Sequence, residues 1–167
     1  MEFSGKITIK NNKENVAEFL SDINNITPCL PGVYDFQNNG GEIQCKLKLD
    51  ISAAKISAMS SVTGKMSFLY KAGLDSINID GSGRIAGSKV KFSISISYES
   101  KGEETLLDWK SSFDFGLIVK MMGKDRVNEI SRDNIDRTMG CITSNSNIQQ
   151  NFFTFINKFY IITVNIV

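Results

Sequence analysis

Alternation of apolar and polar residues predicts that most of the chain is β-strand. In the clearest run, Ile43, Cys45, Leu47, Leu49 and Ile51 are separated by polar residues, which is typical of a strand with one buried and one solvated face. The same period of two occurs over residues 3–9, 56–70, 74–79, 90–98 and 107–115. Short turns rich in glycine and asparagine separate these runs, as in hairpins. The pattern therefore predicts an antiparallel meander after one N-terminal strand.

The segment after the first strand predicts two short helices. Asn11 and Asn12 can cap a helix that has Phe19 and Leu20 on its apolar face. Residues 22–31 continue as a second short helix or turn. This segment ends in a rigid elbow, because the only two prolines of the chain lie three residues apart there. On its own, such an elbow is compatible with a purely structural corner.

The longest helical pattern runs from Leu117 to about Thr143. Residues at steps of three and four form one stripe along it: Val119, Met122, Val127, Ile130, Asn134, Thr138 and Cys141. A helix of about 27 residues would be about 40 Å long, enough to cross a small domain. Because no other segment predicts a helix of similar length, we expect this stripe to pack on the sheet.

The composition narrows the classes of function. With 167 residues, of which 41% are hydrophobic, the chain is expected to form one domain with a real core. The net charge of +1 gives no reason to expect nucleic acid as a partner. Histidine, the commonest catalytic base and metal ligand, is absent. Neither a signal peptide nor a run of about 20 apolar residues is recognisable, so we expect a cytoplasmic protein without a transmembrane span.

The three cysteines predict no metal site and no disulfide framework. Cys29, Cys45 and Cys141 are single, odd in number and not arranged as a CxxC pair. We therefore expect reduced and buried thiols.

Small residues on the inward faces of the predicted strands favour an internal cavity. They are Ala58, Ser60, Gly64, Gly81, Gly83 and Ser111. A core of ordinary density would more often carry Val, Ile or Leu at such places. The cavity would have aromatic and methionine walls. The alternative is an ordinary core in which the small residues mark bulges or sharp bends.

Three short motifs resemble those of a known family. They are the elbow Cys29-Leu30-Pro31-Gly32, the stretch Gly81-Ser82-Gly83 with Ile85-Ala86-Gly87, and Lys120-Met121-Met122-Gly123. With them, residues 1–143 resemble the CoxG family of carbon monoxide dehydrogenase subunits, within the START-like and polyketide cyclase helix-grip (SRPBCC) superfamily. In that family the glycine-rich stretch is a turn between two central strands. The resemblance implies an α+β helix-grip fold, in which a curved antiparallel sheet of about six or seven strands wraps around one long C-terminal helix, with two short helices after strand one.

The same resemblance implies a non-catalytic carrier or accessory protein without a cofactor or metal of its own. It would bind a quinone- or lipid-like molecule between the sheet and the long helix and assist a molybdenum carbon monoxide dehydrogenase-type enzyme. The expected ligand-binding residues are Leu30, Val33, Leu47, Leu49, Met66, Phe68, Gly81, Phe92, Ile94, Trp109, Phe113, Met122 and Ile130.

No catalytic constellation can be assembled from the sequence, so we do not expect an enzyme. Without histidine, only Tyr, Ser, Cys or a carboxylate of raised pKa could transfer protons. A cyclase/aromatase-like enzyme of the same fold and a ligand-free assembly or chaperone partner remain the alternatives. The face on which Asp50, Asp75, Asp80 and Asp108 lie discriminates the enzyme from the carrier.

Residues 144–167 form an extension outside the resemblance. After a polar segment, 145–151, the apolar residues are Phe152, Phe153, Phe155, Ile156, Phe159, Tyr160, Ile161, Ile162, Val164, Ile166 and Val167, with Lys158 as the only charge. This segment is too short to span a bilayer comfortably as a helix. We expect 145–151 to be a hinge and 152–167, as a helix or a strand, to contact a partner or the inner face of the membrane. The alternative is that 152–167 packs on its own domain.

Overall fold

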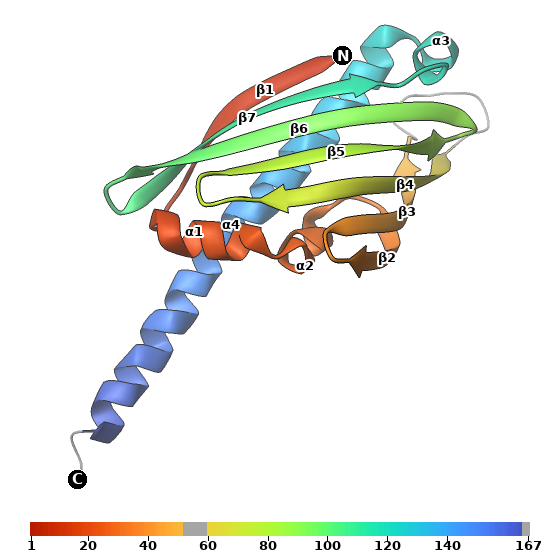
Figure 1. The fold of residues 1–167 in the computed structure, drawn as a ribbon. Coiled ribbons are helices and arrows are strands. Elements are labelled where there is room, and N and C mark those ends of the chain that lie inside the picture. Colours follow the sequence, from red (N-terminus) through yellow and green to blue (C-terminus); the bar gives the residue numbers. More distant parts are fainter. Residues whose placement is uncertain (52–59, 165–167) are drawn as a thin grey trace.

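The fold is a curved sheet closed on its concave side by one long helix (Figure 1). The computed structural model describes the backbone of residues 1–51 and 60–164 and the side chains of residues 1–51 and 60–146. The strands are β1 (Glu2–Ile9), β2 (Val33–Asn39), β3 (Glu42–Asp50), β4 (Ser61–Ala72), β5 (Ser76–Ile85), β6 (Ser88–Lys101) and β7 (Glu104–Asp114). The helices are α1 (Lys13–Ser21), α2 (Ile23–Ile26), the 3-10 helix η1 (Thr27–Cys29), α3 (Ile118–Met122) and α4 (Lys124–Val164). The predicted α+β helix-grip architecture is confirmed.

All seven strands of the described sheet are antiparallel, in the order β1-β7-β6-β5-β4-β3-β2. Strands β2 to β7 pair in chain order, as the hairpin turns predict, and β1 closes the sheet against β7. The glycine-rich turn implied by the resemblance is misplaced, however. Gly81 and Gly83 lie inside β5, paired with Phe92 and Val90 of β6, and the turn itself is formed by Ala86 and Gly87. The part of the predicted strand at 56–59 and Ala58 lie outside the described residues.

Helix α1 begins as the sequence predicts. The Asn12 side chain accepts a hydrogen bond from the Asn15 amide, which satisfies one of the free N–H groups of the first turn. Asn11 is buried and joins three elements: its side-chain amide donates to the Ser146 carbonyl of α4 at 2.9 Å, and its own carbonyl accepts from the Thr105 hydroxyl of β7 at 2.8 Å. These bonds hold the start of α1 between the sheet and the long helix.

The single helix predicted over residues 117–143 is wrong at both ends. Gly123 adopts a φ of +84°, a conformation that other residues rarely take, and it separates α3 from α4. At the other end α4 continues to Val164, so the predicted hinge at 145–151 is helical instead. The first residues of this predicted hinge also belong to the domain, since Ser146 is buried and its carbonyl accepts a hydrogen bond from Asn11. Figure 1 shows the rest of α4 extending past α1, away from the sheet.

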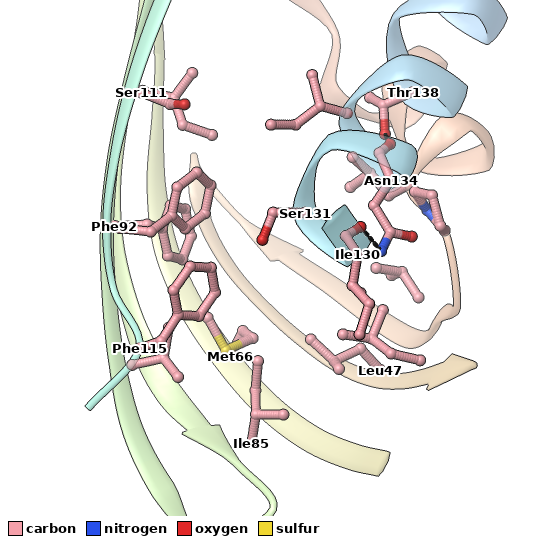
Figure 2. Close-up of a pocket in the computed structure, with 18 of the residues that line it drawn as sticks. Leu47, Met66, Ile85, Phe92, Ser111, Phe115, Ile130, Ser131, Asn134 and Thr138 are labelled. Atoms are coloured by element: carbon pink, nitrogen blue, oxygen red, sulfur yellow. Dashed lines mark hydrogen bonds between the residues drawn. The ribbon is translucent and has the colours of Figure 1, made fainter. Parts of the chain in front are cut away.

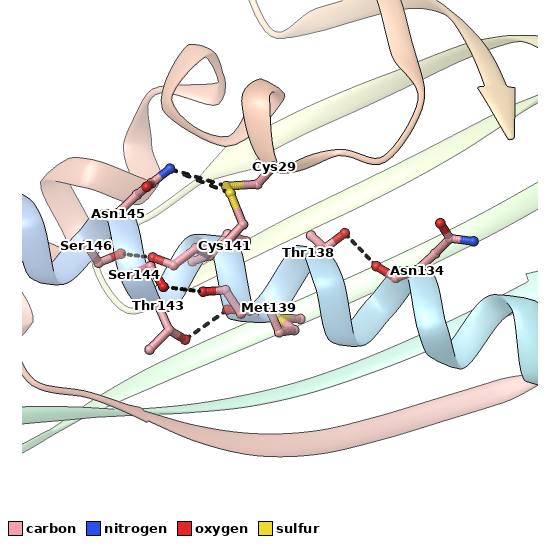
Figure 3. The surroundings of a disulfide bond; sticks show 11 residues. Cys29, Asn134, Thr138, Met139, Cys141, Thr143, Ser144, Asn145 and Ser146 are labelled. Atoms are coloured by element: carbon pink, nitrogen blue, oxygen red, sulfur yellow. Dashed lines mark hydrogen bonds between the residues drawn. A yellow bond between two sulfur atoms is a disulfide. The ribbon is translucent and has the colours of Figure 1, made fainter. Parts of the chain in front are cut away.

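A disulfide joins Cys29 of η1 to Cys141 of α4, 112 residues apart in sequence (Figure 3). The expectation of three reduced thiols is therefore wrong for this pair and holds for Cys45, which is free and buried. Spacing along the chain could not reveal the bond, because the elbow and the helix become neighbours only when the sheet curves. Next to the bond, the Asn145 amide lies 3.5 Å from the Cys29 sulfur.

Candidate functional site

An apolar cavity of about 340 Å³ lies between the concave face of the sheet and α4 (Figure 2). An engineered apolar cavity of about 150 Å³ in another protein is enough to hold benzene. The cavity described here is therefore large enough for a body of about two fused rings, or for a folded stretch of alkyl chain. Its walls come from α2, the elbow, the strands β2 to β7, α3 and α4.

Nearly all of the ligand-binding residues expected from the sequence lie in these walls. They are Leu30, Val33, Leu47, Leu49, Met66, Phe68, Phe92, Ile94, Trp109, Phe113, Met122 and Ile130. Gly81 is the exception, because it does not line the cavity. That these residues bind a ligand stays a prediction.

A row of phenylalanine rings forms the sheet side of the cavity, and Gly81 makes the row feasible. Phe68, Gly81, Phe92 and Phe113 are cross-strand neighbours on β4, β5, β6 and β7. The Phe68 and Phe92 ring centroids are 6.0 Å apart across Gly81, and those of Phe92 and Phe113 are 5.9 Å apart. A Cβ atom on Gly81 would lie 2.4 Å from the Phe92 ring and 2.6 Å from Phe68, so any side chain there would displace both.

The glycines of the inner face therefore do not open the cavity directly. Gly83 is covered by Met66, whose sulfur would lie 2.6 Å from an added Cβ, and Gly64 is covered by Ile85. Of the small residues singled out in the sequence, Ser111 does line the cavity. The prediction of a cavity agrees with the structure, but the glycines contribute by letting larger neighbours spread over the sheet.

Among the residues that the structure describes, the polar ones in the lining are few and uncharged: Ser111, Ser131, Asn134 and Thr138. Three of them follow one another on α4, and each donates to a backbone carbonyl one turn earlier. The Ser131 hydroxyl donates to Val127 at 2.7 Å, the Asn134 amide to Ile130 at 2.8 Å and the Thr138 hydroxyl to Asn134 at 2.8 Å. Sequence reasoning placed Asn134 and Thr138 on the inward stripe but did not assign them to the site. Their polarity on an otherwise apolar stripe was the available signal.

The carboxylates that would indicate an enzyme lie elsewhere. None of Asp50, Asp75, Asp80 and Asp108 lines the cavity. Asp108 pairs with Lys6 at 2.8 Å on the outer face, and the hydrogen bond from Lys6 lowers the pKa of the Asp108 carboxyl. Asp75 pairs with Lys13. Among the residues that the structure describes, the walls thus contain no charged side chain.

Tyr70, Tyr98 and the free thiol of Cys45 are also neutral near pH 7. The Tyr70 hydroxyl donates to the Leu20 carbonyl, and burial raises its pKa above the ordinary value. The Tyr98 hydroxyl donates to the Gly73 carbonyl. Cys45 does line the cavity, but burial raises the pKa of its thiol, which stays neutral at pH 7.

The described residues offer neither a metal site nor a membrane span. No group of three or more Cys, Asp or Glu residues among them could hold a metal ion. No helix in the described part of the chain is long and apolar enough to cross a membrane.

Solved structures of the same fold come from several bacteria. A conserved protein from Geobacillus kaustophilus superposes with a TM-score of 0.76 at 17% identity, covering 87% of this chain and 95% of that one. The Zhui aromatase/cyclase from Streptomyces sp. R1128 superposes with a TM-score of 0.62 at 13% identity, and the match covers 87% of this chain and 93% of that one. A START superfamily protein from Mycobacterium smegmatis superposes with a TM-score of 0.61 at 13% identity, and the match covers 89% of this chain and 98% of that one. At these identities the likeness shows the fold alone.

The sequence comparisons are more specific. No protein with a curated description matches the sequence. The family model of CoxG, a subunit of carbon monoxide dehydrogenase, matches residues 5–147. The match includes most of β1, the elbow and the strands β2 to β7. It extends into α4 as far as Ser146, which accepts the hydrogen bond from Asn11, and the next residue. Since this match extends over most of the chain, the protein belongs to the CoxG family of carbon monoxide dehydrogenase subunits.

Proposed function

We propose that the protein is a non-catalytic carrier or accessory protein that binds an apolar, quinone- or lipid-like molecule in the cavity. The observation that carries this proposal is the chemistry of the lining, whose described part consists of aliphatic, aromatic and sulfur-containing side chains with four neutral polar ones. Apolar surface of this kind gains free energy when it leaves water, and it offers little to a charged or strongly polar molecule.

The aromatic row favours a flat ligand. Phe92, Phe113 and Phe115 stack in sequence, with centroids 5.9 and 5.4 Å apart. Together with Trp109, these rings offer π-faces and edges against which a planar ring system can pack. Met66 and Met122, which are flexible, can adapt to a tail of variable length.

The family name supplies the proposed partner, a carbon monoxide dehydrogenase-type molybdenum enzyme that would hold the metal and redox cofactors. We place the protein in the cytoplasm, with peripheral contact at the inner face of the membrane through residues 152–167. The Cys29–Cys141 disulfide is more typical of oxidising compartments, so alkylation of thiols in intact cells, before purification, tests this placement. Three alkylated cysteines would support the cytoplasm, and one would contradict it.

The decisive experiment identifies the ligand and its position. An organic extract of the purified protein is analysed by mass spectrometry, and added menaquinone is titrated while the fluorescence of Trp109 is followed. Trp109 is the only tryptophan of the chain and lines the cavity, so quenching reports binding there. Ser131→Phe, which places an additional ring in the cavity, should weaken quenching strongly, whereas Asp136→Phe, on the exposed face of the same helix, should not. An empty extract together with no quenching would refute the carrier.

A cyclase/aromatase-like enzyme is the second candidate, because one neighbour of the same fold is an aromatase/cyclase. Its difficulty is that the described part of the lining contains no acid or base and offers only hydroxyls, one amide and a neutral thiol. Turnover of an aromatic polyketide-like substrate by the purified protein, lost in Ser131→Phe, would favour it. A ligand-free assembly partner would instead co-purify with an enzyme while its cavity stays inaccessible.

A further inference from the structure

A row of basic residues crosses the outer face of the sheet, on the side that α4 does not cover (Figure 1). Its members, here called the basic row, are cross-strand neighbours on β3, β4, β5 and β6: Lys46, Lys65, Arg84 and Lys89. Side chains alternate between the two faces of a strand, and the residues next to these cations in sequence line the cavity. The basic row therefore points away from the cavity, toward the solvent.

The basic row is held together against its own repulsion. Like charges directly opposite each other on neighbouring strands destabilise a sheet. Lys46 is offset by Asp35, which lies 2.5 Å away. Every Asp and Glu of the chain is among the residues whose side chains the structure describes, and within these residues none forms an ion pair with Lys65, Arg84 or Lys89. These three cations are also exposed.

Elsewhere on the same face, opposite charges are cross-strand neighbours. Lys6 of β1 lies opposite Asp108 of β7 and bonds to it at 2.8 Å, and Lys91 of β6 lies opposite Asp114. Lysines that protect a sheet from edge-to-edge association lie on its edge strands. The basic row instead crosses the inner strands β3 to β6, so protection of an edge does not explain it.

An exposed aromatic side chain extends the row by one strand. Tyr34 of β2, which is 48% exposed, is the cross-strand neighbour of Lys46. Because neighbouring strands are about 4.8 Å apart, the five positions span about 19 Å, which fits within a standard protein–protein interface. Tyrosine and arginine are enriched in such interfaces. The exposed residues beside the row on β4 and β5 are small and polar, namely Thr63, Ser67 and Ser82, so they leave the cations accessible.

We propose that the basic row, with Tyr34 at its end, is the surface on which an acidic face of a partner protein docks, and that this partner is the molybdenum enzyme of the proposed function. The proposal rests on that function only for the identity of the partner. A sheet holds its cations at fixed intervals, which suits a protein whose carboxylates are also fixed in place. Binding to a membrane would favour apolar side chains among the cations, whereas the residues beside the row on β4 and β5 are polar.

The test measures the affinity of the full-length protein for a purified molybdenum carbon monoxide dehydrogenase by biolayer interferometry. Lys65→Glu/Arg84→Glu reverses the centre of the basic row and should weaken binding roughly 10-fold or more. Lys71→Glu/Lys110→Glu is the matched control, because it reverses two exposed cations of the same face outside the row and changes the net charge equally. It should weaken binding less than about 3-fold. Both variants should still bind menaquinone, since none of these residues lines the cavity.

Thermal unfolding measures the repulsion within the row. Lys65→Glu places a carboxylate between Lys46 and Arg84 and should raise the Tm. Lys71→Glu should not raise it, because the neighbour of Lys71 on β5 is the uncharged Asn78. A Tm of Lys65→Glu that is no higher than that of Lys71→Glu would contradict the repulsion.

Three binding results would overturn the docking surface while the accessory function stands. Equal weakening by the two double variants would show an effect of net charge alone. Unchanged affinity in Lys65→Glu/Arg84→Glu would show that the enzyme docks elsewhere. Loss of binding to phosphatidylglycerol vesicles in that variant, with its affinity for the enzyme retained, would assign the basic row to a membrane. If the enzyme does not bind to the unsubstituted protein, the docking surface and the proposed partner both fail.

Discussion

Removal of the disulfide between Cys29 and Cys141 should lower the stability of the fold by an amount that follows from the structure. The bond closes a loop defined by a separation of 112 residues, and it fastens η1 to the middle of α4. In the chain-entropy model, opening a loop of this length costs about 5 kcal/mol of folding free energy at 25 °C. For a domain of this size, that corresponds to a fall in Tm of roughly 10–20 °C.

The assay compares the Cys29→Ala/Cys141→Ala variant with the unsubstituted protein, with and without dithiothreitol, by circular dichroism during heating. Reductant should lower the Tm of the unsubstituted protein toward that of the variant and leave the variant unaffected. A thiol titration of the denatured, non-reduced protein should find one thiol, that of Cys45, and three after reduction.

A further consequence concerns the cavity. Leu30 and Pro31 directly follow Cys29, and Thr138 and Met139 shortly precede Cys141 on α4; all four line the cavity. Loss of the bond should therefore also speed the release of a bound apolar ligand. Three thiols without reduction, with a Tm that does not respond to reductant, would refute the assigned bond and the magnitude derived from it.

Three further sets of variants test the packing around Gly81, the ionisation of Tyr70 and the role of the C-terminal extension. Gly81→Ala should destabilise the fold by about 1–3 kcal/mol in urea unfolding, because the new Cβ would overlap the Phe92 ring and Phe68. Its control is Gly140→Ala in α4, where no atom lies within 4 Å of the new Cβ and a gain of about 0.5–1 kcal/mol is expected; equal effects of the two would contradict the packing argument. Because burial raises the Tyr70 pKa, the folded state resists ionisation, so its contribution to stability is complete below the unfolded pKa near 10 and is lost as the pH rises above it. The Tm should then fall more steeply above pH 10 in the unsubstituted protein than in Tyr70→Phe, and parallel curves would show that Tyr70 is not the group responsible. A chain ending at residue 147 should keep its Tm and lose binding to anionic liposomes, whereas one ending at residue 145 should also lose about 1–3 kcal/mol, because the Asn11 amide loses its Ser146 acceptor. Retained liposome binding in the 147-residue chain would contradict a contact through the extension.

The sequence by itself determined the elements and the faces they bury. Strict alternation in β3, β6 and β7 specifies a sheet with one apolar side, because side chains point to opposite faces at a period of two. The Asn12 cap and the buried Phe19 and Leu20 follow from local hydrogen bonding and a period near 3.6. One apolar sheet face and one long helix leave few ways to form a core, which is why nearly all of the residues named in advance do line the cavity.

Only the tertiary structure decided what depends on the distance between segments remote in sequence. Cys29 and Cys141 carry no local signal of each other, and their Cα atoms come within 5.4 Å because the elbow packs on α4. Gly81 looked like a turn or an opening in the wall, whereas its neighbours on β4 and β6 use the missing side chain to bring two rings together. Patterns along the chain fix local geometry and burial, but pairing across the fold arises only when the sheet curves around the helix.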